Sequence, residues 1–223
     1  MSTRAYDSSG RRAAAEGRRS NVLVAARRLF GERGYAGTSL ADVADAAGVS
    51  VPFVRASFGG KAGLLRRLVD VAIVGDEEPV ALGQRPEARA LASQGAHEQV
   101  SGFARIITGV QQRVAGLASV LTEAAGTDSA VREDLARSQR QRRRGMREFV
   151  GMLEDAGHLR AGLDPDAATD VVWALTDPRL FVGLCGERRW SVRRYEQFLV
   201  DQLAAALLPA PMAAAPGRAG AHE

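Results

Sequence analysis

The stretch SLADVADAAGVSVPFVRASFGGK, residues 39–61, decides the fold. Apolar residues recur at helical spacing over residues 40–47, and Gly48 ends that run. Ser50 then provides an N-cap for a second short helix, with Pro52 in its first turn, where the missing N–H is not needed. Two short helices joined by a glycine turn are typical of a helix-turn-helix, whose second helix fits the major groove of DNA.

The sequence on either side of this motif is also helical in pattern. A first helix is expected from Ser20 to Gly34, and a fourth from Gly60 to about Val74. Further helices are expected over about 87–94, 97–124, 128–156, 165–186 and 191–208. No stretch alternates as a strand does. The expected fold class is therefore all-α, with an N-terminal three-helix helix-turn-helix DNA-binding domain and a C-terminal helical effector and dimerisation domain.

Composition divides the chain further. Residues 1–18 are rich in Arg, Ser, Gly and Ala without apolar periodicity, which favours a flexible basic arm. The DNA-binding domain is expected over residues 19–74, because Gly, Pro and acidic residues gather directly after it. Residues 75–208 would form the effector-binding and dimerisation domain. The Pro- and Ala-rich segment 209–223 is expected to be a disordered tail.

Charge points to an anionic partner. The sequence pI is about 9.9, and the basic excess lies in residues 1–74, where twelve Arg or Lys face six Asp or Glu. Double-stranded DNA is the expected partner. The arginines of the arm could lie along a minor groove or phosphates, or could simply belong to a solvated tail; they are Arg11, Arg12, Arg18 and Arg19.

Other classes of function find little support. A single cysteine, Cys185, and three scattered histidines give no disulfide and no metal-ligand spacing, so neither a metal nor a cofactor is expected. Cysteine usage and the lack of a signal-peptide pattern or an apolar membrane span favour a cytoplasmic protein with no membrane partner. No phosphate-binding glycine loop and no nucleophile motif appears, so an enzyme is not expected.

Specific DNA contacts follow from the second helix of the motif. Val54 and Phe58 lie four residues apart and are expected to point inward. Arg55, on the opposite side, could bind guanine or a phosphate, and its apolar neighbours could meet thymine methyl groups. Other polar residues nearby are expected to hydrogen-bond the DNA backbone. The complete set of expected DNA contacts is Tyr35, Thr38, Ser39, Ser50, Val51, Pro52, Phe53, Arg55, Ala56, Ser57 and Lys61.

The run VLVAARRLFGERGYAGTSLADVADAAGVSVPFVRASFGGKAGLL, residues 22–65, resembles the first four helices of TetR-type transcriptional regulators. The resemblance lies in Ala-Ala-x-x-Leu-Phe, Gly-Tyr, Thr-Ser, Ala-Gly-Val-Ser, then Phe and Lys before Leu-Leu. It implies a homodimer on a palindromic operator, usually a repressor released by a small molecule. Arg55 and Ser57 depart from the family, which usually has an aromatic residue at the first position and Tyr or His at the second.

The C-terminal part offers candidates for two further roles. Aromatic residues and Met among Ala, Leu and Val helices could line a pocket for a small-molecule effector of unknown identity, or could be core: Phe103, Phe149, Met152, Trp173 and Phe181. Residues 164–208 resemble the last two helices of such regulators, which usually form the dimer interface. Two apolar stripes there would meet across a two-fold axis or pack inside one subunit; they include Val171, Leu175, Tyr195, Leu199, Gln202 and Leu203.

Two alternatives remain open at this level. One is a DNA-binding protein without sequence preference, against which the net acidic C-terminal part argues. The other is a helical interaction module that does not bind DNA, for which the departures at Arg55 and Ser57 leave room. The arginine-rich run 137–147 could bind an acidic ligand or DNA, but such a run is usually a solvated helix face.

Overall fold

The computed structural model describes residues 8–76, 78 and 80–210. In it, helix α1 (Ser8–Arg33) begins much earlier than the sequence pattern indicates. The expectation of a flexible arm over residues 1–18 is therefore wrong for residues 8–18, and residues 1–7 lie outside the described part. The physical reason is that Ala and Arg are good helix formers, and adding turns to an existing helix carries no nucleation cost. Apolar periodicity is absent because nearly every side chain from Arg12 to Arg18 is exposed to solvent.

The helix-turn-helix is confirmed. Helix α2 (Leu40–Ala47) is followed by α3 (Val51–Phe58), and α4 (Lys61–Val74) then leads away from the motif. Both short helices end at a glycine in the left-handed conformation, Gly48 with φ 65° and Gly59 with φ 75°. That conformation suits glycine because it lacks a Cβ, so the two turns are fixed by local sequence.

The rest of the described chain is helical and contains no strand in residues 8–76, 78 and 80–210. Short 3-10 turns cover Leu82–Gln84, Leu91–Ser93 and Ala115–Leu117, and a π-helical segment covers Val182–Glu187. The α-helices are α5 (Pro86–Ala90), α6 (Ala96–Val114), α7 (Ala118–Thr127), α8 (Ser129–Asp155), α9 (Pro165–Leu175), α10 (Pro178–Phe181) and α11 (Val192–Leu207). The expected all-α fold class is confirmed.

Two of the expected helices are interrupted. The stretch 97–124 splits into α6 and α7 at the 3-10 turn around Gly116, a residue of low helix propensity. The stretch 165–186 breaks at Asp177, which precedes Pro178 and caps α10 by accepting a hydrogen bond from the Arg179 N–H. A residue before proline disfavours the helical conformation, so this break was visible in the sequence.

Side chains from both parts of the chain share the first of two hydrophobic cores. This core surrounds α1 to α4 and is completed by Val114 of α6, Val120 and Ala124 of α7 and Val131 of α8. The second core lies between α6, α8, α9 and α11 and includes Phe103, Phe149 and Tyr195 among its buried members. The DNA-binding motif is therefore mounted rigidly on the C-terminal helices.

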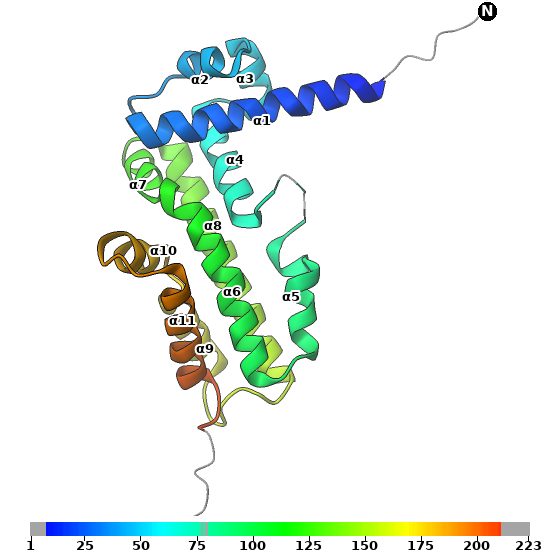
Figure 1. Ribbon diagram of the computed structural model, residues 1–223, viewed down its shortest axis with the longest axis vertical. Helices are drawn as coiled ribbons and strands as arrows, with labels where there is room; N and C mark the ends of the chain where they lie inside the picture. Colours follow the sequence, from blue (N-terminus) through cyan, green and yellow to red (C-terminus); the bar gives the residue numbers. More distant parts are fainter. Residues whose placement is uncertain (1–7, 77, 79, 211–223) are drawn as a thin grey trace, which may run out of the picture.

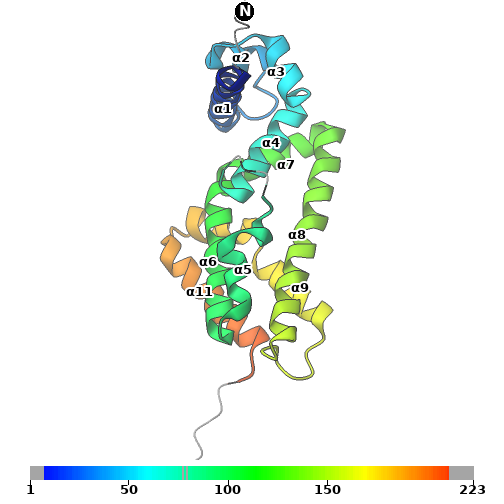
Figure 2. The same ribbon diagram turned by 90° about the vertical axis from the view of Figure 1, so that its right-hand side faces the viewer.

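The helices are arranged as a head on an elongated body (Figure 1). Helix α1 lies across one end, with α2 and α3 on its outer side, and α4 runs from there toward the long helices α6 and α8. The view turned by 90° shows α1 almost end-on beneath α2, with the remaining helices below (Figure 2). This arrangement places α2 and α3 at the extreme end of the molecule.

Candidate nucleic-acid interface

Local hydrogen bonds fix both ends of α2. The Ser39 hydroxyl accepts from the Asp42 N–H at 3.1 Å, and the Asp42 carboxylate accepts from the Ser39 N–H at 2.8 Å. This capping box satisfies two N–H groups that a helix start leaves free. The hydrogen bonds from Ser39 also hold the pKa of the Asp42 carboxyl below its usual value. At the other end the Val49 N–H donates to the Ala44 carbonyl at 3.0 Å, which closes the turn into α3.

Helix α3 is anchored by one side and free on the other. Val54 is fully buried in the first core, and Phe58 packs against the same core while half-buried. The expectation that these two side chains point inward is confirmed. Pro52, Arg55 and Ala56 are exposed on the opposite side. The result is a short, capped helix with one outward face at the end of the molecule.

The other expected contacts on α3 are only partly accessible. Val51, Phe53 and Ser57 are half-buried, and the first two pack against the first core. Ser50 is exposed, and its hydroxyl oxygen accepts from the Phe53 N–H at 3.3 Å. The hydroxyl proton of Ser50 has no partner among residues 8–76, 78 and 80–210 and could donate to a phosphate oxygen.

Three residues expected to bind the DNA backbone have their side chains directed to the protein itself. Tyr35 and Thr38 are 3% and 1% exposed, and the Thr38 hydroxyl hydrogen-bonds the carbonyls of Leu29 and Gly34. The Ser39 hydroxyl donates to Asp42 at 2.6 Å. The expected phosphate contacts are wrong for the buried side chains of Tyr35 and Thr38, because the α1–α2 connection uses them to hold its own backbone in place. Ser39 is exposed, and the contact expected for it stays a prediction.

The Lys61 side chain is partly used by the protein itself and partly free for another contact. Its ammonium donates to the carbonyls of Tyr35 at 2.8 Å and Thr38 at 3.0 Å, and it lies 4.2 Å from the centre of the Tyr35 ring. Two of its three N–H groups therefore tie α4 to the α1–α2 connection. The third could still meet a phosphate, so the contact expected for Lys61 stays a prediction.

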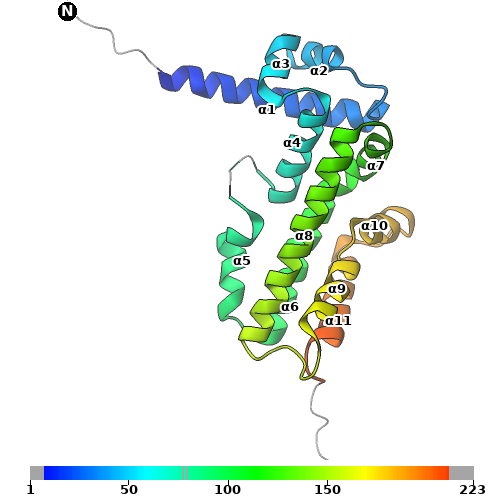
Figure 3. The same ribbon diagram turned by 180° about the vertical axis from the view of Figure 1, so that it is seen from behind.

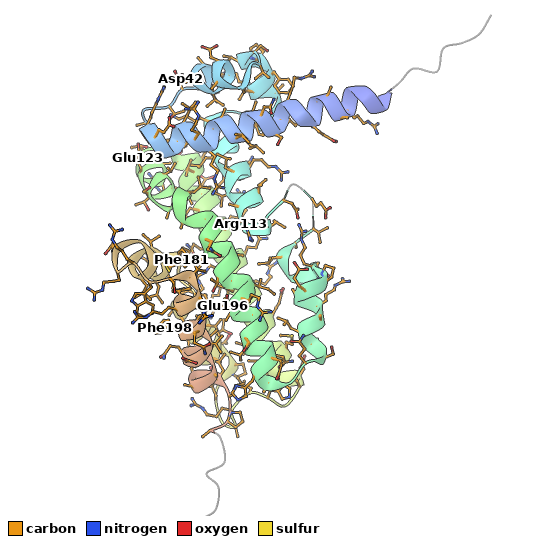
Figure 4. All side chains as sticks on the ribbon, in the orientation of Figure 1. Asp42, Arg113, Glu123, Phe181, Glu196 and Phe198 are labelled. Atoms are coloured by element: carbon orange, nitrogen blue, oxygen red, sulfur yellow. The ribbon has the colours of Figure 1, made fainter. Side chains whose placement is uncertain are left out.

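The α1–α2 connection is clasped by α7 and α8, a contact that no local sequence signal indicates. The Glu123 carboxylate accepts from the N–H groups of Tyr35 at 2.9 Å and Ala36 at 2.8 Å (Figure 4). The Tyr35 phenol donates to Asp128, the N-cap of α8, at 2.7 Å. These bonds lower the pKa of both carboxyls, and burial with the bond to Asp128 raises the pKa of Tyr35. We call Tyr35, Ala36, Glu123 and Asp128 the clasp.

A second connection involves Arg113, near the end of α6. Its guanidinium donates to the Ala72 carbonyl at 2.8 Å and the Ile73 carbonyl at 3.1 Å, at the end of α4. Its own carbonyl accepts from the Arg27 guanidinium of α1 at 2.7 Å. Burial lowers the pKa of Arg113, and the two carbonyls of α4 still accept charge-assisted hydrogen bonds from it.

The residues expected to bind an effector do not surround one cavity. Phe103 and Phe149 stack with ring centres 3.8 Å apart inside the second core, and Trp173 lies 4.7 Å beneath the guanidinium of Arg142. Met152 is half-buried and packs against the same core. A cavity of about 510 Å³ lies instead where α6 meets the π-helical segment and α11. Its lining comprises Gln112, Ala115, Phe181, Val182, Cys185, Gly186, Trp190 and Val192.

The residues expected at a dimer interface separate into two groups. Tyr195, Leu199 and Leu203 are fully buried, because this face of α11 packs on α6 and α9 of the same chain. The prediction is wrong for these three, and the stripe is core. Val171 is 37% exposed, Gln202 is exposed and Leu175 is half-buried, which leaves them available to a second copy.

The arginine-rich run 137–147 is mostly a solvated face with intramolecular ion pairs. Arg143 pairs with Asp170 at 3.2 Å, and Arg137 with Asp134 at 2.8 Å. Arg142 differs, because it turns inward and donates to the Trp173 carbonyl and the Thr176 hydroxyl. The described part of the chain contains no cluster of His, Cys, Asp and Glu suited to a metal ion. No helix in that part is long and apolar enough to cross a membrane.

A capped helix-turn-helix with an exposed second helix, mounted on a larger helical part, defines a helical DNA-binding regulator. Residues 22–68 match the family model described as bacterial regulatory proteins, tetR family. The helix-turn-helix region of this chain, residues 22–68, therefore matches the TetR family, and the resemblance seen in the sequence is confirmed over these residues.

Solved structures share this fold over most of the chain. A protein from Rhodococcus sp. assigned to the TetR-family regulators has a TM-score of 0.64 at 20% identity, over 86% of this chain and 99% of its own. SmeT, in complex with triclosan, has a TM-score of 0.68 at 20% sequence identity, over 92% of this chain and 98% of its own. NalD is the secondary repressor of the MexAB-OprM multidrug efflux pump in Pseudomonas aeruginosa. Its structure has a TM-score of 0.60 at 20% sequence identity, over 87% of this chain and 98% of its own. No curated protein sequence matches significantly.

Proposed function

We propose that this protein is a repressor that binds a palindromic operator as a homodimer and is released by a small-molecule effector. One observation carries the proposal: the exposed face of α3, with Pro52, Arg55 and Ala56 outward, while Val54 fixes the other side in the core. A helix presented this way fits a major groove about 12 Å wide. Residues 19–74 act as the DNA-binding domain in this proposal and residues 75–208 as the effector and dimerisation domain.

The side chains of α3 divide into two kinds of DNA contact. Arg55 can form two hydrogen bonds with guanine O6 and N7, and Pro52 and Ala56 can touch thymine methyl groups. Ser50 and Lys61 supply donors to phosphate oxygens, which fix the position of the helix without reading sequence. This protein would therefore read bases from very few side chains, and loss of Arg55 would remove most of its hydrogen-bonded readout.

Dimerisation would use the outer side of α9 to α11. The support is the exposed Val171 on α9, with half-buried Trp190 and Phe198 at the start and middle of α11, whose rings meet edge to face at 5.7 Å. Large apolar side chains at a surface are typical of a contact with another protein. A two-fold dimer would place two copies of α3 on successive turns of DNA, which is why the operator is expected to be palindromic.

An effector would enter the cavity between α6, the π-helical segment and α11. Its aromatic and aliphatic lining suits a small apolar molecule, and its position beside α6 places a ligand close to the helix that contacts α4 through Arg113. SmeT in complex with triclosan and NalD as a repressor give precedent for both roles in proteins of this fold. Such a regulator would act in the cytoplasm, where it meets the chromosome.

The proposal is tested by titrating the purified protein against the DNA upstream of its own gene and against an unrelated fragment, at two salt concentrations. Preference for the upstream fragment that survives the higher salt supports an operator-specific regulator. Equal binding that falls steeply with salt would favour sequence-independent binding. Failure to bind either fragment, or any duplex selected from a random pool, would favour a helical interaction module.

A further inference from the structure

The first part of α1 extends well past the helix-turn-helix as a bare helix. In Figures 1 and 3 it projects beyond α3, away from the side of the molecule where α10 and α11 lie. From Arg12 to Arg19 every side chain is exposed except that of Ala15, which is half-buried, and the first core begins only at Val22. Helices in proteins are usually stabilised by packing, so an exposed helical segment of this kind is a candidate for contact with another molecule.

The exposed surface of this segment is basic. Arg12 and Arg19 are seven residues apart, which places them on the same face two turns apart, and Arg18 lies beside Arg19. Glu16 is the only acidic residue between Ser8 and Arg19. Within residues 8–76, 78 and 80–210 these three arginines form no ion pair. Three cations with Glu16 as the one acidic residue among them leave the projecting helix with a net positive charge, which fits an anionic surface.

The basic face is continuous with the proposed DNA-reading helix. The Arg18 guanidinium lies 5.3 Å from the centre of the Phe53 ring on α3. This contact sets the projecting segment beside α3, so an anionic polymer lying along α3 would pass next to it.

We infer that the projecting part of α1 binds the phosphates of duplex DNA outside the half-site read by α3, through Arg12, Arg18 and Arg19. The inference rests on the proposed function. With dimerisation through α9 to α11, the segment points away from the partner and so toward the outer flank of the operator. Residues 8–19 span about 18 Å at the helical rise, or about five base pairs. The contacts add affinity and salt dependence but no base specificity.

The test compares two lengths of one duplex. A random-sequence pool is selected on the full-length protein, and the recovered sequence is prepared both trimmed to its specific core and extended by six arbitrary base pairs on each side. Affinities are measured over a range of salt concentrations for the wild type and for Arg12→Ala/Arg19→Ala. Alanine is the better helix former at these exposed positions, so the fold of α1 is retained in this variant.

The control variant is Arg140→Ala/Arg144→Ala, which removes the same charge from exposed positions on α8. The wild type and the control should bind the extended duplex about tenfold more tightly than the trimmed one at low salt. Their affinity for the extended duplex should also fall more steeply with salt, because each phosphate contact adds roughly 0.9 to the salt slope. Arg12→Ala/Arg19→Ala, which keeps only Arg18 of the three arginines, should lose most of this gain, whereas Arg12→Lys/Arg19→Lys should keep it, since a phosphate contact needs only the charge.

Two results would overturn the inference while leaving the proposed function intact. One is wild-type affinity that does not depend on duplex length, and the other is a length effect that is as large in Arg12→Ala/Arg19→Ala as in the wild type. Binding of the trimmed core by this variant with unchanged sequence preference would show that α3 still reads the operator. Failure of the wild type to select any duplex would instead overturn the proposed function together with this inference.

Discussion

The phenol of Tyr35 donates a 2.7 Å hydrogen bond to the carboxylate of Asp128, 93 residues further along the chain. The same carboxylate accepts from the Ala130 N–H at 3.0 Å at the start of α8. One acidic side chain thus caps a helix of the C-terminal part and anchors the connection between α1 and α2. The clasp therefore makes the position of the helix-turn-helix depend on α7 and α8.

Tyr35→Phe removes only the phenol oxygen of this contact. The buried ring keeps its packing against Phe30, while the loss of a hydrogen bond to a charged group should cost about 1 to 3 kcal/mol of unfolding free energy. Urea denaturation followed by circular dichroism measures the change. Asp128→Asn, which can still cap α8, is the matched partner, and the double mutant should be less destabilised than the sum of the two single effects. Unchanged stability of Tyr35→Phe would contradict a structural role for the bond.

Glu123→Gln tests the pH dependence of the clasp. Hydrogen bonds from Ala36 and Tyr35 lower the pKa of the Glu123 carboxyl in the folded protein, so its contribution to stability is present above its usual pKa and is lost as the pH falls through the folded pKa. The wild type should melt at a higher temperature than Glu123→Gln at pH 7. The difference should shrink below about pH 4. A difference that is constant from pH 7 to pH 3 would show that ionisation of Glu123 is irrelevant.

Arg55→Ala should weaken operator binding without affecting the fold. Loss of a two-pronged contact to guanine costs about 1 to 3 kcal/mol of binding free energy and relaxes the preference for that base. Fluorescence anisotropy with the operator and with single-base variants measures both effects. Arg105→Ala on α6, whose side chain is 74% exposed, is the control and should bind normally. Equal losses in the two variants would mean that Arg55 acts only through net charge.

Val171→Asp should convert the proposed dimer to a monomer, because a carboxylate would be buried in an apolar contact without a partner. Light scattering coupled to size-exclusion chromatography measures the mass. Val24→Asp is the control. Val24 is also an exposed valine, with 69% of its surface accessible, but it lies on α1, away from the proposed interface. It should leave the mass unchanged. Dimers in both variants would place the interface elsewhere.

Cys185 reports on the effector cavity that it lines. Burial raises the pKa of its thiol, so less thiolate is present at pH 8 than for a free cysteine, and iodoacetamide should react more slowly than with glutathione. Mass spectrometry of the alkylated protein follows the rate. In urea the rate should rise to that of an ordinary thiol. A native rate as fast as that of glutathione would contradict the burial of this thiol.

Local signals made the helix-turn-helix predictable. Ser39, Gly48, Ser50 and Gly59 each act within a few residues of their own position, so caps and turns can be derived from the printed sequence. The projecting part of α1 could not be found through apolar periodicity, because that pattern records packing and residues 12–19 are exposed except for the half-buried Ala15.

Patterns show that a face is buried but not what buries it. Tyr195, Leu199 and Leu203 were correctly seen as an apolar stripe, yet the stripe faces α6 and α9 of its own chain. The clasp was invisible for a related reason. Glu123 lies 88 residues from Tyr35, and a lone glutamate on a helix carries no signal for two backbone N–H groups that the fold brings to it.

Arg113 joins three helices at a single point. Its guanidinium holds the last carbonyls of α4, and its own carbonyl receives Arg27 from α1. A ligand that displaced the final turn of α6 would either move α4 and α1 with it or break all three hydrogen bonds. In the proposed dimer, movement of α4 and α1 would change the spacing between the two copies of α3. A shift of a few ångströms there is enough to put the two helices out of step with successive turns of the double helix.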